Sequence, residues 1–177
     1  MEVRTAAQMR QAGRALAALL RPGDLVLLHG DLGAGKTTLT QGIGVGLDVQ
    51  GTVASPTFII ARTHRARHDG PDLVHVDAYR IGSLDELETL DLDASLEDSV
   101  TVVEWGEGLA EALSADRLEL TLSRPRGAAS RSAPDRDPAL PDDDDPAPEP
   151  RELTVAAYGP RWDGVDVAAA LQAALHD

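Results

Sequence analysis

The sequence predicts an α/β fold in which helices cover both faces of a central, mostly parallel β-sheet. Segments with strand patterns alternate along the chain with segments of helical periodicity. The run at residues 25–28 is continuously apolar and flanked by glycines, which is typical of a strand buried on both faces. A glycine-rich turn then leads into a helix, and folds of this class bind ligands at the carboxyl ends of their strands.

The first half of the chain divides into helices and strands with clear boundaries. Thr5 and Gln8 have the spacing of a capping box at the start of a helix over residues 5–20, and Pro22-Gly23 ends it. The buried strand follows, and then a helix from about residue 36 to residue 47. Runs rich in β-branched residues predict two further strands, over residues 57–63 and 73–77.

The second half continues the alternation and ends in a helix. Ser83 and Glu86 have N-cap spacing at the start of a short helix. Further strands are expected over residues 100–105, 116–123 and 152–158, and a closing helix over residues 165–175.

Residues 124–150 interrupt this pattern. They hold seven of the eleven prolines, four consecutive aspartates and a single large apolar residue, Leu140. Such a segment buries too little apolar surface to order itself. We therefore divide the chain into a core of residues 1–123, a flexible insertion of residues 124–150, and a strand and helix in residues 151–177 that complete the same domain.

The composition excludes several classes of protein. The chain has no cysteine, so it forms neither disulfides nor thiolate metal sites, which suits the cytoplasm. No apolar run approaches the ~20 residues that cross a bilayer, and arginines interrupt the amino-terminal region, so we expect a soluble cytoplasmic protein without membrane contact. The net charge of −14 disfavours strong, direct binding to nucleic acid.

The segment from Gly30 to Thr37 has the pattern Gly-(four residues)-Gly-Lys-Thr and predicts a phosphate-binding P-loop, as in P-loop NTPases. Its glycines let backbone N–H groups surround phosphate oxygens, and the helix that follows adds a partial positive charge. Lys36 is expected to reach the β- and γ-phosphates, and the Thr37 hydroxyl to bind Mg²⁺. Lys36 is also the only lysine of the chain, beside fifteen arginines. The chain thus uses arginine for its other positive charges and a compact ammonium at the position expected to bind phosphates.

A site for Mg²⁺ and a nucleotide also needs a carboxylate at the end of a neighbouring strand. Asp77 and Glu104 each end an apolar strand, and their spacing does not rank them. One of them is expected to hold Mg²⁺, directly or through water. The other could orient Thr37 or an attacking water.

Two more polar residues stand near these elements. Ser55 follows the P-loop helix at a place where P-loop proteins carry a hydroxyl that senses the γ-phosphate, although a proline turn at Pro56 explains it equally well. Arg80 comes three residues after Asp77 and could stabilise transferred phosphoryl charge. It could equally pair with Asp85 or with the neighbouring glutamate.

Four motifs in a fixed order resemble a known family. They are residues 30–38, Ser55-Pro56-Thr57-Phe58, Asp77-Ala78-Tyr79-Arg80 and Val103-Glu104-Trp105-Gly106-Glu107. Together they are similar to the bacterial TsaE (YjeE) family over residues 5–123, whereas the proline-rich insertion departs from its compact pattern. The resemblance implies a P-loop ATPase, weak alone, that acts with the proteins TsaB and TsaD. This system attaches threonylcarbamoyl to an adenosine beside the anticodon of tRNAs.

The resemblance also implies roles for individual residues, with ATP and Mg²⁺ as cofactors. Thr37 and Glu104 match the Mg²⁺ ligands of the family, and Asp77 matches a second acid near the γ-phosphate. Thr5 resembles a threonine that contacts the nucleotide, and Trp105 a tryptophan beside the site. The residues that match the phosphate loop are Gly33, Ala34, Gly35, Lys36, Thr37 and Thr38. The residues expected to carry catalysis are Asp77, Lys36 and Arg80.

Other functions are compatible with a P-loop on a chain of this length. A small-molecule kinase is the main alternative, and its arginine-bearing lid would draw on Arg62, Arg65 and Arg67. A regulatory GTPase would need an Asn/Thr-Lys-x-Asp element, but the single lysine is already assigned to phosphate. A binding module with a vestigial P-loop is the remaining alternative.

Overall fold

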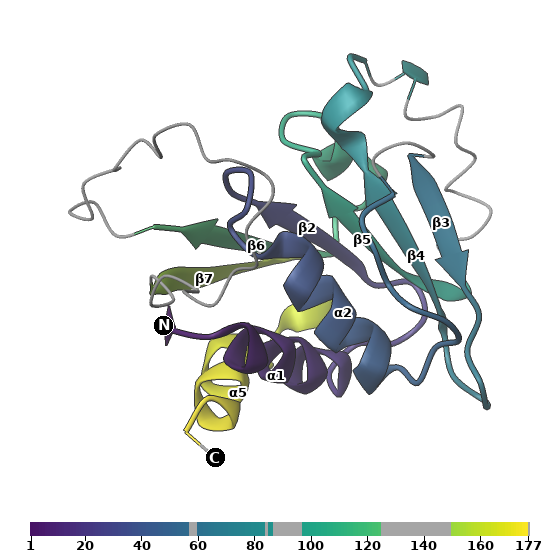
Figure 1. Cartoon of the computed structure of the whole chain (residues 1–177). Coiled ribbons are helices and arrows are strands. Elements are labelled where there is room, and N and C mark those ends of the chain that lie inside the picture. Colours follow the sequence, from purple (N-terminus) through teal and green to yellow (C-terminus); the bar gives the residue numbers. More distant parts are fainter. Residues whose placement is uncertain (57–59, 84, 87–96, 125–149, 177) are drawn as a thin grey trace, which may run out of the picture.

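The computed structural model describes the chain except residues 57–59, 84, 87–96, 125–149 and 177 (Figure 1). In this described part, seven strands form a single mixed sheet. The strands are β1 (Glu2–Val3), β2 (Leu25–His29), β3 (Ala61–His64), β4 (Asp72–Asp77), β5 (Ser99–Glu104), β6 (Arg117–Ser123) and β7 (Arg151–Tyr158). The helices are α1 (Ala6–Ala17), α2 (Lys36–Gly46) and α5 (Val167–Ala174), with short 3₁₀ helices η1 (Ala78–Arg80), η2 (Ala110–Leu113) and η3 (Pro160–Trp162).

The parallel centre of the sheet aligns the strand ends that the sequence singled out. The strands lie in the order β1-β7-β6-β2-β5-β4-β3. The central strands β6, β2, β5 and β4 are parallel, whereas β1, β7 and β3 pair antiparallel with their neighbours. Leu28 of β2 pairs with Glu104 of β5, and Glu104 pairs with Asp77 of β4. Both acids therefore lie at the carboxyl ends of the central strands, where the P-loop also leaves β2.

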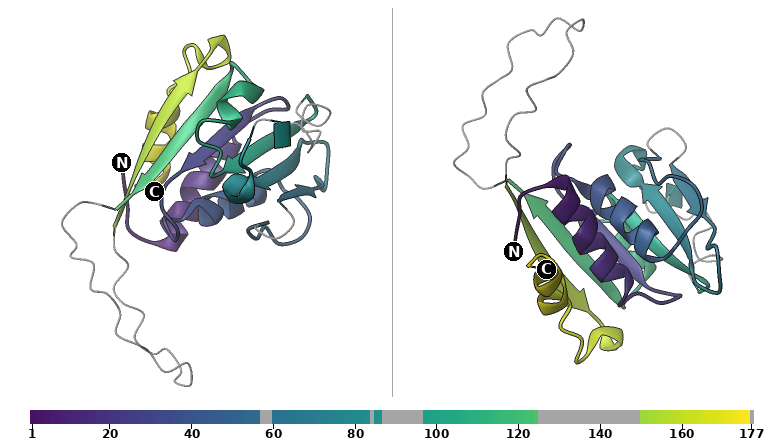
Figure 2. Two further views of the ribbon diagram at one scale, coloured as in Figure 1. Left: turned by 90° about the horizontal axis from the view of Figure 1, so that it is seen from above. Right: turned by 60° about the horizontal axis from the view of Figure 1, so that its bottom comes forward.

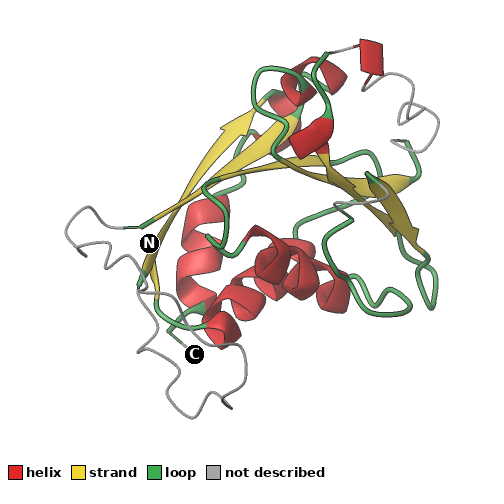
Figure 3. Cartoon of the chain, turned by 45° about the horizontal axis from the view of Figure 1, so that its top comes forward, coloured by secondary structure: helices red, strands yellow, loops and turns green. Residues whose placement is uncertain are grey.

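Helices cover both faces of the sheet, as predicted, but unequally (Figure 3). On one face, α1, α2 and α5 pack over an extended core that includes Leu16, Leu39 and Val102. On the other face, a smaller core around Leu27 and Val103 packs against η1 and η2 through their alanines. Among the described residues, no helix has the length and apolar character needed to cross a membrane.

The start of α1 differs in detail from the predicted capping box. The Thr5 hydroxyl accepts a hydrogen bond from the Gln8 N–H at 3.1 Å, as an N-cap does. The Gln8 side chain, however, accepts from the backbone N–H of Arg4 at 2.8 Å and not from that of Thr5. The glutamine therefore satisfies a donor one residue before the cap, and the helix still begins where the sequence predicts.

Predicted and observed bounds differ most at β3. This strand begins at Ala61, four residues later than expected, and residues 57–59 of the predicted strand lie outside the described residues. Ile60 has a φ of 68°, which a strand residue does not adopt, so the strand begins after it, and only its carbonyl oxygen bonds to β4, accepting from the Asp77 N–H at 2.8 Å. At the predicted short helix, the Glu86 N–H donates to Ser83 Oγ at 3.2 Å. The continuation of that helix and nearly all of the 124–150 insertion also lie outside the described residues.

The carboxy-terminal segment extends the same sheet. β7 pairs with β6 on one side and with β1 on the other, and α5 packs beside α1 (Figure 2). Arg161 ties this segment to the start of β2, because its guanidinium donates to both carboxylate oxygens of Asp24 at 2.9 Å. It also donates to the Leu19 carbonyl oxygen at 2.8 Å. The buried Asp24 carboxylate thus has a bidentate cationic partner from the far end of the chain.

Two glycines allow α1 and α2 to approach closely. A Cβ on Gly13 would lie 2.3 Å from the Leu39 carbonyl oxygen, and a Cβ on Gly42 would lie 2.2 Å from the Arg10 carbonyl oxygen. Both contacts are with backbone atoms, which move only if a whole helix moves. The spacing of the two helices therefore depends on the absence of side chains at both positions.

We expect Gly13→Ala to lower the free energy of unfolding by about 2 kcal/mol, because the added methyl group forces the two helices apart. Urea denaturation followed by circular dichroism measures the loss. Gly70→Ala is the matched control, since no atom lies within 4 Å of a Cβ at that position. It should change the free energy of unfolding by less than about 0.5 kcal/mol, and equal losses in both variants would contradict the close-packing explanation.

Candidate functional site

The P-loop joins the end of β2 to the start of α2 and requires glycine for its backbone. Gly30, Gly33 and Gly35 have φ values of 137°, 76° and 109°, a region that other residues rarely adopt. Gly30 also passes close to β6, since a Cβ there would lie 2.3 Å from the Leu122 carbonyl oxygen. The glycines therefore let the loop turn closely past β6 and lead into the start of α2, where backbone N–H groups have no partner within the helix.

Lys36, the first residue of α2, is almost fully buried, with 4% of its surface exposed. Its ammonium donates to the carbonyl oxygens of Gly30 at 2.6 Å and Asp31 at 3.0 Å. It also lies 3.7 Å from the centre of the Trp105 ring, in a cation–π contact. Burial lowers the pKa of Lys36 below its usual value, and the negative charges of Glu104, Asp77 and Asp31 oppose that shift.

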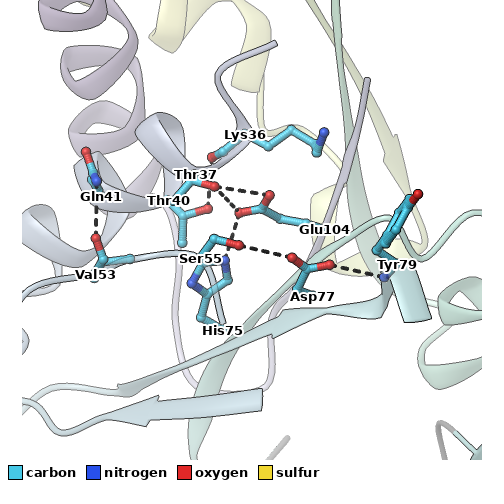
Figure 4. Close-up of polar contacts among 10 residues, drawn as sticks. All are labelled: Lys36, Thr37, Thr40, Gln41, Val53, Ser55, His75, Asp77, Tyr79 and Glu104. Atoms are coloured by element: carbon cyan, nitrogen blue, oxygen red, sulfur yellow. Dashed lines mark hydrogen bonds and ion pairs between the residues drawn. The ribbon is translucent and has the colours of Figure 1, made fainter. Parts of the chain in front are cut away.

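Thr37 and Glu104 meet beside this ammonium (Figure 4). The Thr37 hydroxyl lies 3.0 Å from Glu104 Oε1 and 3.3 Å from Oε2. His75 of β4 contacts the same carboxylate, with Nε2 2.8 Å from Oε1. Glu104 is only 2% exposed, so these contacts replace most of its hydration.

Asp77, the second acid, lies at the end of the neighbouring strand and has its own partners (Figure 4). The Ser55 hydroxyl donates to Oδ2 at 3.0 Å, and the Tyr79 N–H donates to Oδ1 at 3.1 Å. Gln41 of α2 donates to the Val53 carbonyl oxygen at 3.2 Å and thereby ties the segment before Ser55 to the P-loop helix. The arrangement connects Asp77 to the loop that the sequence marked as a possible γ-phosphate sensor.

Aromatic side chains form one wall of the site. Trp105 follows Glu104 with a φ of 63°, so the chain turns sharply at the end of β5. Its ring meets that of Tyr79 edge to face, with ring centres 5.4 Å apart. Tyr79 is 68% exposed, and Leu32 at the tip of the P-loop is 86% exposed. The rim is therefore apolar, whereas the floor is charged.

These groups line a cavity of about 610 Å³. Nine of the residues assigned to the site from the sequence line it, namely Gly33, Ala34, Gly35, Lys36, Thr37, Thr38, Asp77, Glu104 and Trp105. Leu32, Ser55 and Tyr79 complete the lining. Residues that are far apart in the sequence thus converge on one site.

Thr5 and Arg80 do not line this cavity. The Thr5 hydroxyl caps α1, and the start of that helix lies beside the P-loop, because Met9 Cε is 3.2 Å from where a Cβ of Gly35 would be. Arg80 ends η1 and is exposed. The roles expected for these two residues stay predictions.

Sequence reasoning gave no role to His75 or Tyr79. His75 is fully buried in a strand that is otherwise mostly apolar, two residues before Asp77. A polar residue in such a strand is a signal for a buried contact, but the sequence does not name the partner. Tyr79 lies within a motif that was noted for its acid and its arginine, and only the fold brings its ring to Trp105.

The site has the chemistry for a phosphate chain and a small divalent cation. Backbone N–H groups and an ammonium suit phosphate oxygens. A hydroxyl and a carboxylate that already lie 3.0 Å apart are the hard oxygen ligands that Mg²⁺ prefers. Thr37 and Glu104 therefore fit a Mg²⁺ ion.

Comparison with known proteins identifies the family of this chain. The family model described as "Threonylcarbamoyl adenosine biosynthesis protein TsaE" matches residues 3–133. A protein from Streptomyces coelicolor named "tRNA threonylcarbamoyladenosine biosynthesis protein TsaE" is 56% identical over 160 residues, which cover 90% of this chain and 97% of that protein. A protein of the same name from Bacillus subtilis is 43% identical over 110 residues, covering 61% of this chain and 66% of the relative.

A solved structure agrees with the observed fold. The crystal structure of YdiB from Bacillus subtilis matches with a TM-score of 0.65 at 29% identity, covering 98% of this chain and 93% of that chain. The likeness thus extends over the amino-terminal core and the carboxy-terminal strand and helix. The chain belongs to the TsaE family, whose members are named for the biosynthesis of threonylcarbamoyladenosine in tRNA.

Proposed function

We propose that this chain binds ATP together with Mg²⁺ and hydrolyses the nucleotide slowly. The convergence of Lys36, Thr37 and Glu104 on one cavity is the observation on which the proposal depends. An ammonium and a hydroxyl at the start of a helix, with a carboxylate at the end of a neighbouring strand, are what P-loop proteins use for a triphosphate and its metal ion. The cavity volume of about 610 Å³ is within the range of small-molecule sites.

Thr37 and Glu104 are the proposed Mg²⁺ ligands. The Thr37 hydroxyl has Glu104 as its partner, at 3.0 Å, and this contact favours Glu104 over Asp77 for that role. Bound Mg²⁺ would neutralise charge on the phosphates. The chain's own part is to hold two oxygens at the start of α2 and the end of β5.

Asp77, Lys36 and Arg80 are the proposed catalytic residues. Both oxygens of Asp77 are held, one by Ser55 and one by the Tyr79 N–H, so the carboxylate has a defined direction for orienting a water. Each carboxylate oxygen has a second lone pair, so a water can bond to Asp77 while both of these contacts remain. Lys36 and Arg80 would stabilise charge on the phosphates.

Residues around the phosphate site are proposed to bind the rest of the nucleotide. Trp105 offers an aromatic face at the wall of the cavity. Thr5 stands at the start of α1, next to the P-loop side of the molecule. Both belong to the proposed nucleotide contacts, together with the backbone N–H groups of residues 33–38.

We further infer that the chain acts with the proteins TsaB and TsaD in forming threonylcarbamoyladenosine in tRNA, in the cytoplasm. Membership of the TsaE family supports this role. The net charge of −14 supports weak or indirect contact with tRNA. The chain would then contribute nucleotide binding to the system, and partner proteins would hold the tRNA.

The structure weakens the alternative of a small-molecule kinase. Arg65 pairs with Asp72 at 2.6 Å, and Arg67 lies 3.5 Å from Asp48. Asp72 begins β4, so Arg65 lies at the opposite end of that strand from Asp77. Two of the three arginines proposed for a kinase lid, Arg65 and Arg67, are therefore paired away from the candidate site.

Lys36→Ala should reduce ATP affinity by at least about 100-fold, because the phosphates lose their buried ammonium. Isothermal titration calorimetry measures the affinity, and a reconstituted system with TsaB and TsaD should then modify no tRNA. Arg62→Ala is the control, since it removes an exposed positive charge outside the cavity. Unchanged tRNA modification by Lys36→Ala would contradict the proposed function.

Asp77→Asn should lower the rate of ATP hydrolysis about 100-fold and leave ATP affinity within about threefold. The amide keeps the size of the side chain but cannot accept bonds at both positions. Single-turnover hydrolysis of radiolabelled ATP measures the rate. If hydrolysis continues at the wild-type rate, Asp77 has no part in the reaction.

Glu104→Gln should remove most of the gain in affinity that Mg²⁺ gives to ATP, by about tenfold or more, because the metal loses an anionic ligand. Calorimetric titrations with Mg²⁺ and with a chelator measure this gain. Affinity in the chelator should stay near that of the wild type. If Mg²⁺ still raises ATP affinity as much as in the wild type, Glu104 is not the metal ligand and another acid holds the ion.

A further inference from the structure

His75 is a buried histidine that the proposed reaction does not use. It lies on β4, one strand from Glu104, and none of its surface is exposed. Its Nε2 is 2.8 Å from Glu104 Oε1, a carboxylate that is itself only 2% exposed (Figure 4). The register explains the contact, because Glu104 pairs with Asp77, two residues beyond His75 on the same face of β4.

The surroundings of the ring define the direction of this hydrogen bond. With Glu104 ionised, the carboxylate only accepts, and the tautomer that bonds to it carries its hydrogen on Nε2. Among the described residues, Nδ1 is buried and has no hydrogen-bond partner. All of the polar contact that His75 makes in this part of the chain is therefore directed at Glu104.

Packing alone does not account for a histidine at this position. The neighbouring residues Leu73, Val74 and Val76 are apolar and buried, so an apolar side chain would satisfy the strand. A buried ring nitrogen without a partner destabilises a fold. The hydrogen bond from the imidazole to the Glu104 carboxylate thus explains why a histidine stands here.

Two donors from different elements fix that carboxylate. Thr37 at the start of α2 approaches both oxygens, at 3.0 and 3.3 Å, whereas His75 bonds to Oε1 alone. A glutamate held from two directions loses the freedom to rotate about its terminal bond. It therefore keeps one direction relative to Thr37 and the cavity.

We propose that His75 is a positioning residue, whose Nε2–H holds Glu104 Oε1 so that the carboxylate stays directed at Thr37 and the Mg²⁺ position. The inference rests on the proposed function, because it assigns His75 to the Mg²⁺ ligand of that site. Partners that orient a metal-binding carboxylate commonly change metal affinity by about tenfold or more when they are removed.

The test compares variants of the full chain by calorimetry with a non-hydrolysable ATP analogue, in Mg²⁺ and in a chelator. His75→Leu and His75→Asn lose the donor at the Nε2 position, whereas His75→Gln places an amide N–H near it. We expect the first two to reduce the Mg²⁺-dependent gain in affinity by about tenfold and to leave the affinity in chelator within about twofold. His75→Gln should recover the gain to within about threefold of the wild type.

His64→Leu is the matched control. His64 is also a buried histidine, 3% exposed, but it lies on β3 opposite Leu73, at the other end of β4 from Asp77. Its substitution should leave the Mg²⁺-dependent gain unchanged. If His75→Leu does not fold, His75→Asn decides the question, since it retains a polar side chain that is too short to reach Glu104.

A double-mutant cycle tests whether His75 acts through Glu104. In a Glu104→Gln background, His75→Leu should cause no further loss of the Mg²⁺ effect. The proposal is overturned if His75→Leu and His75→Asn retain the wild-type Mg²⁺ effect, or if they weaken binding equally with and without Mg²⁺. A wild-type chain that binds no ATP analogue under either condition would instead overturn the proposed function itself.

Discussion

The parallel register of β2, β5 and β4 is the constraint on which the site depends. It places Leu28, Glu104 and Asp77 side by side, so that the P-loop and both acids leave the sheet at one edge. Any shift of one residue between β5 and β4 would turn one acid to the opposite face. The buried cores on both faces hold this register, because β2, β5 and β4 alternate their side chains between them.

Three charged groups share a buried space, and the ammonium of Lys36 and the two carboxylates partly offset one another's charge. Lys36, Asp77 and Glu104 are 4%, 4% and 2% exposed, which would be costly for an isolated charge. The acids offset part of the effect that burial has on the pKa of Lys36. Electrostatic interactions are stronger in such a place than in water, so a phosphate chain and a cation would be held tightly by few residues.

The contacts that hold the elements of the site in place lie outside the cavity. The close approach of α1 and α2 at Gly13 and Gly42 fixes the helix that begins with Lys36. Arg161 and Asp24 join the carboxy-terminal segment to the start of β2, at the end of the strand away from the P-loop. These contacts leave the rim at Leu32 and Tyr79 exposed. The exposed residues of the rim thus take no part in the packing contacts that hold the site in place.

Short stretches of sequence determined the features that depend on local backbone chemistry. The glycines of the P-loop, the buried strand before it and the Thr5 cap are all readable there, because positive φ angles, continuous burial and N-capping constrain neighbouring residues. Only the tertiary structure decided which acid meets Thr37, how His75 bonds to Glu104, and that β3 and β7 run antiparallel. These depend on contacts between strands far apart in the chain, and spacing along a sequence carries no record of which strands become neighbours or in what direction.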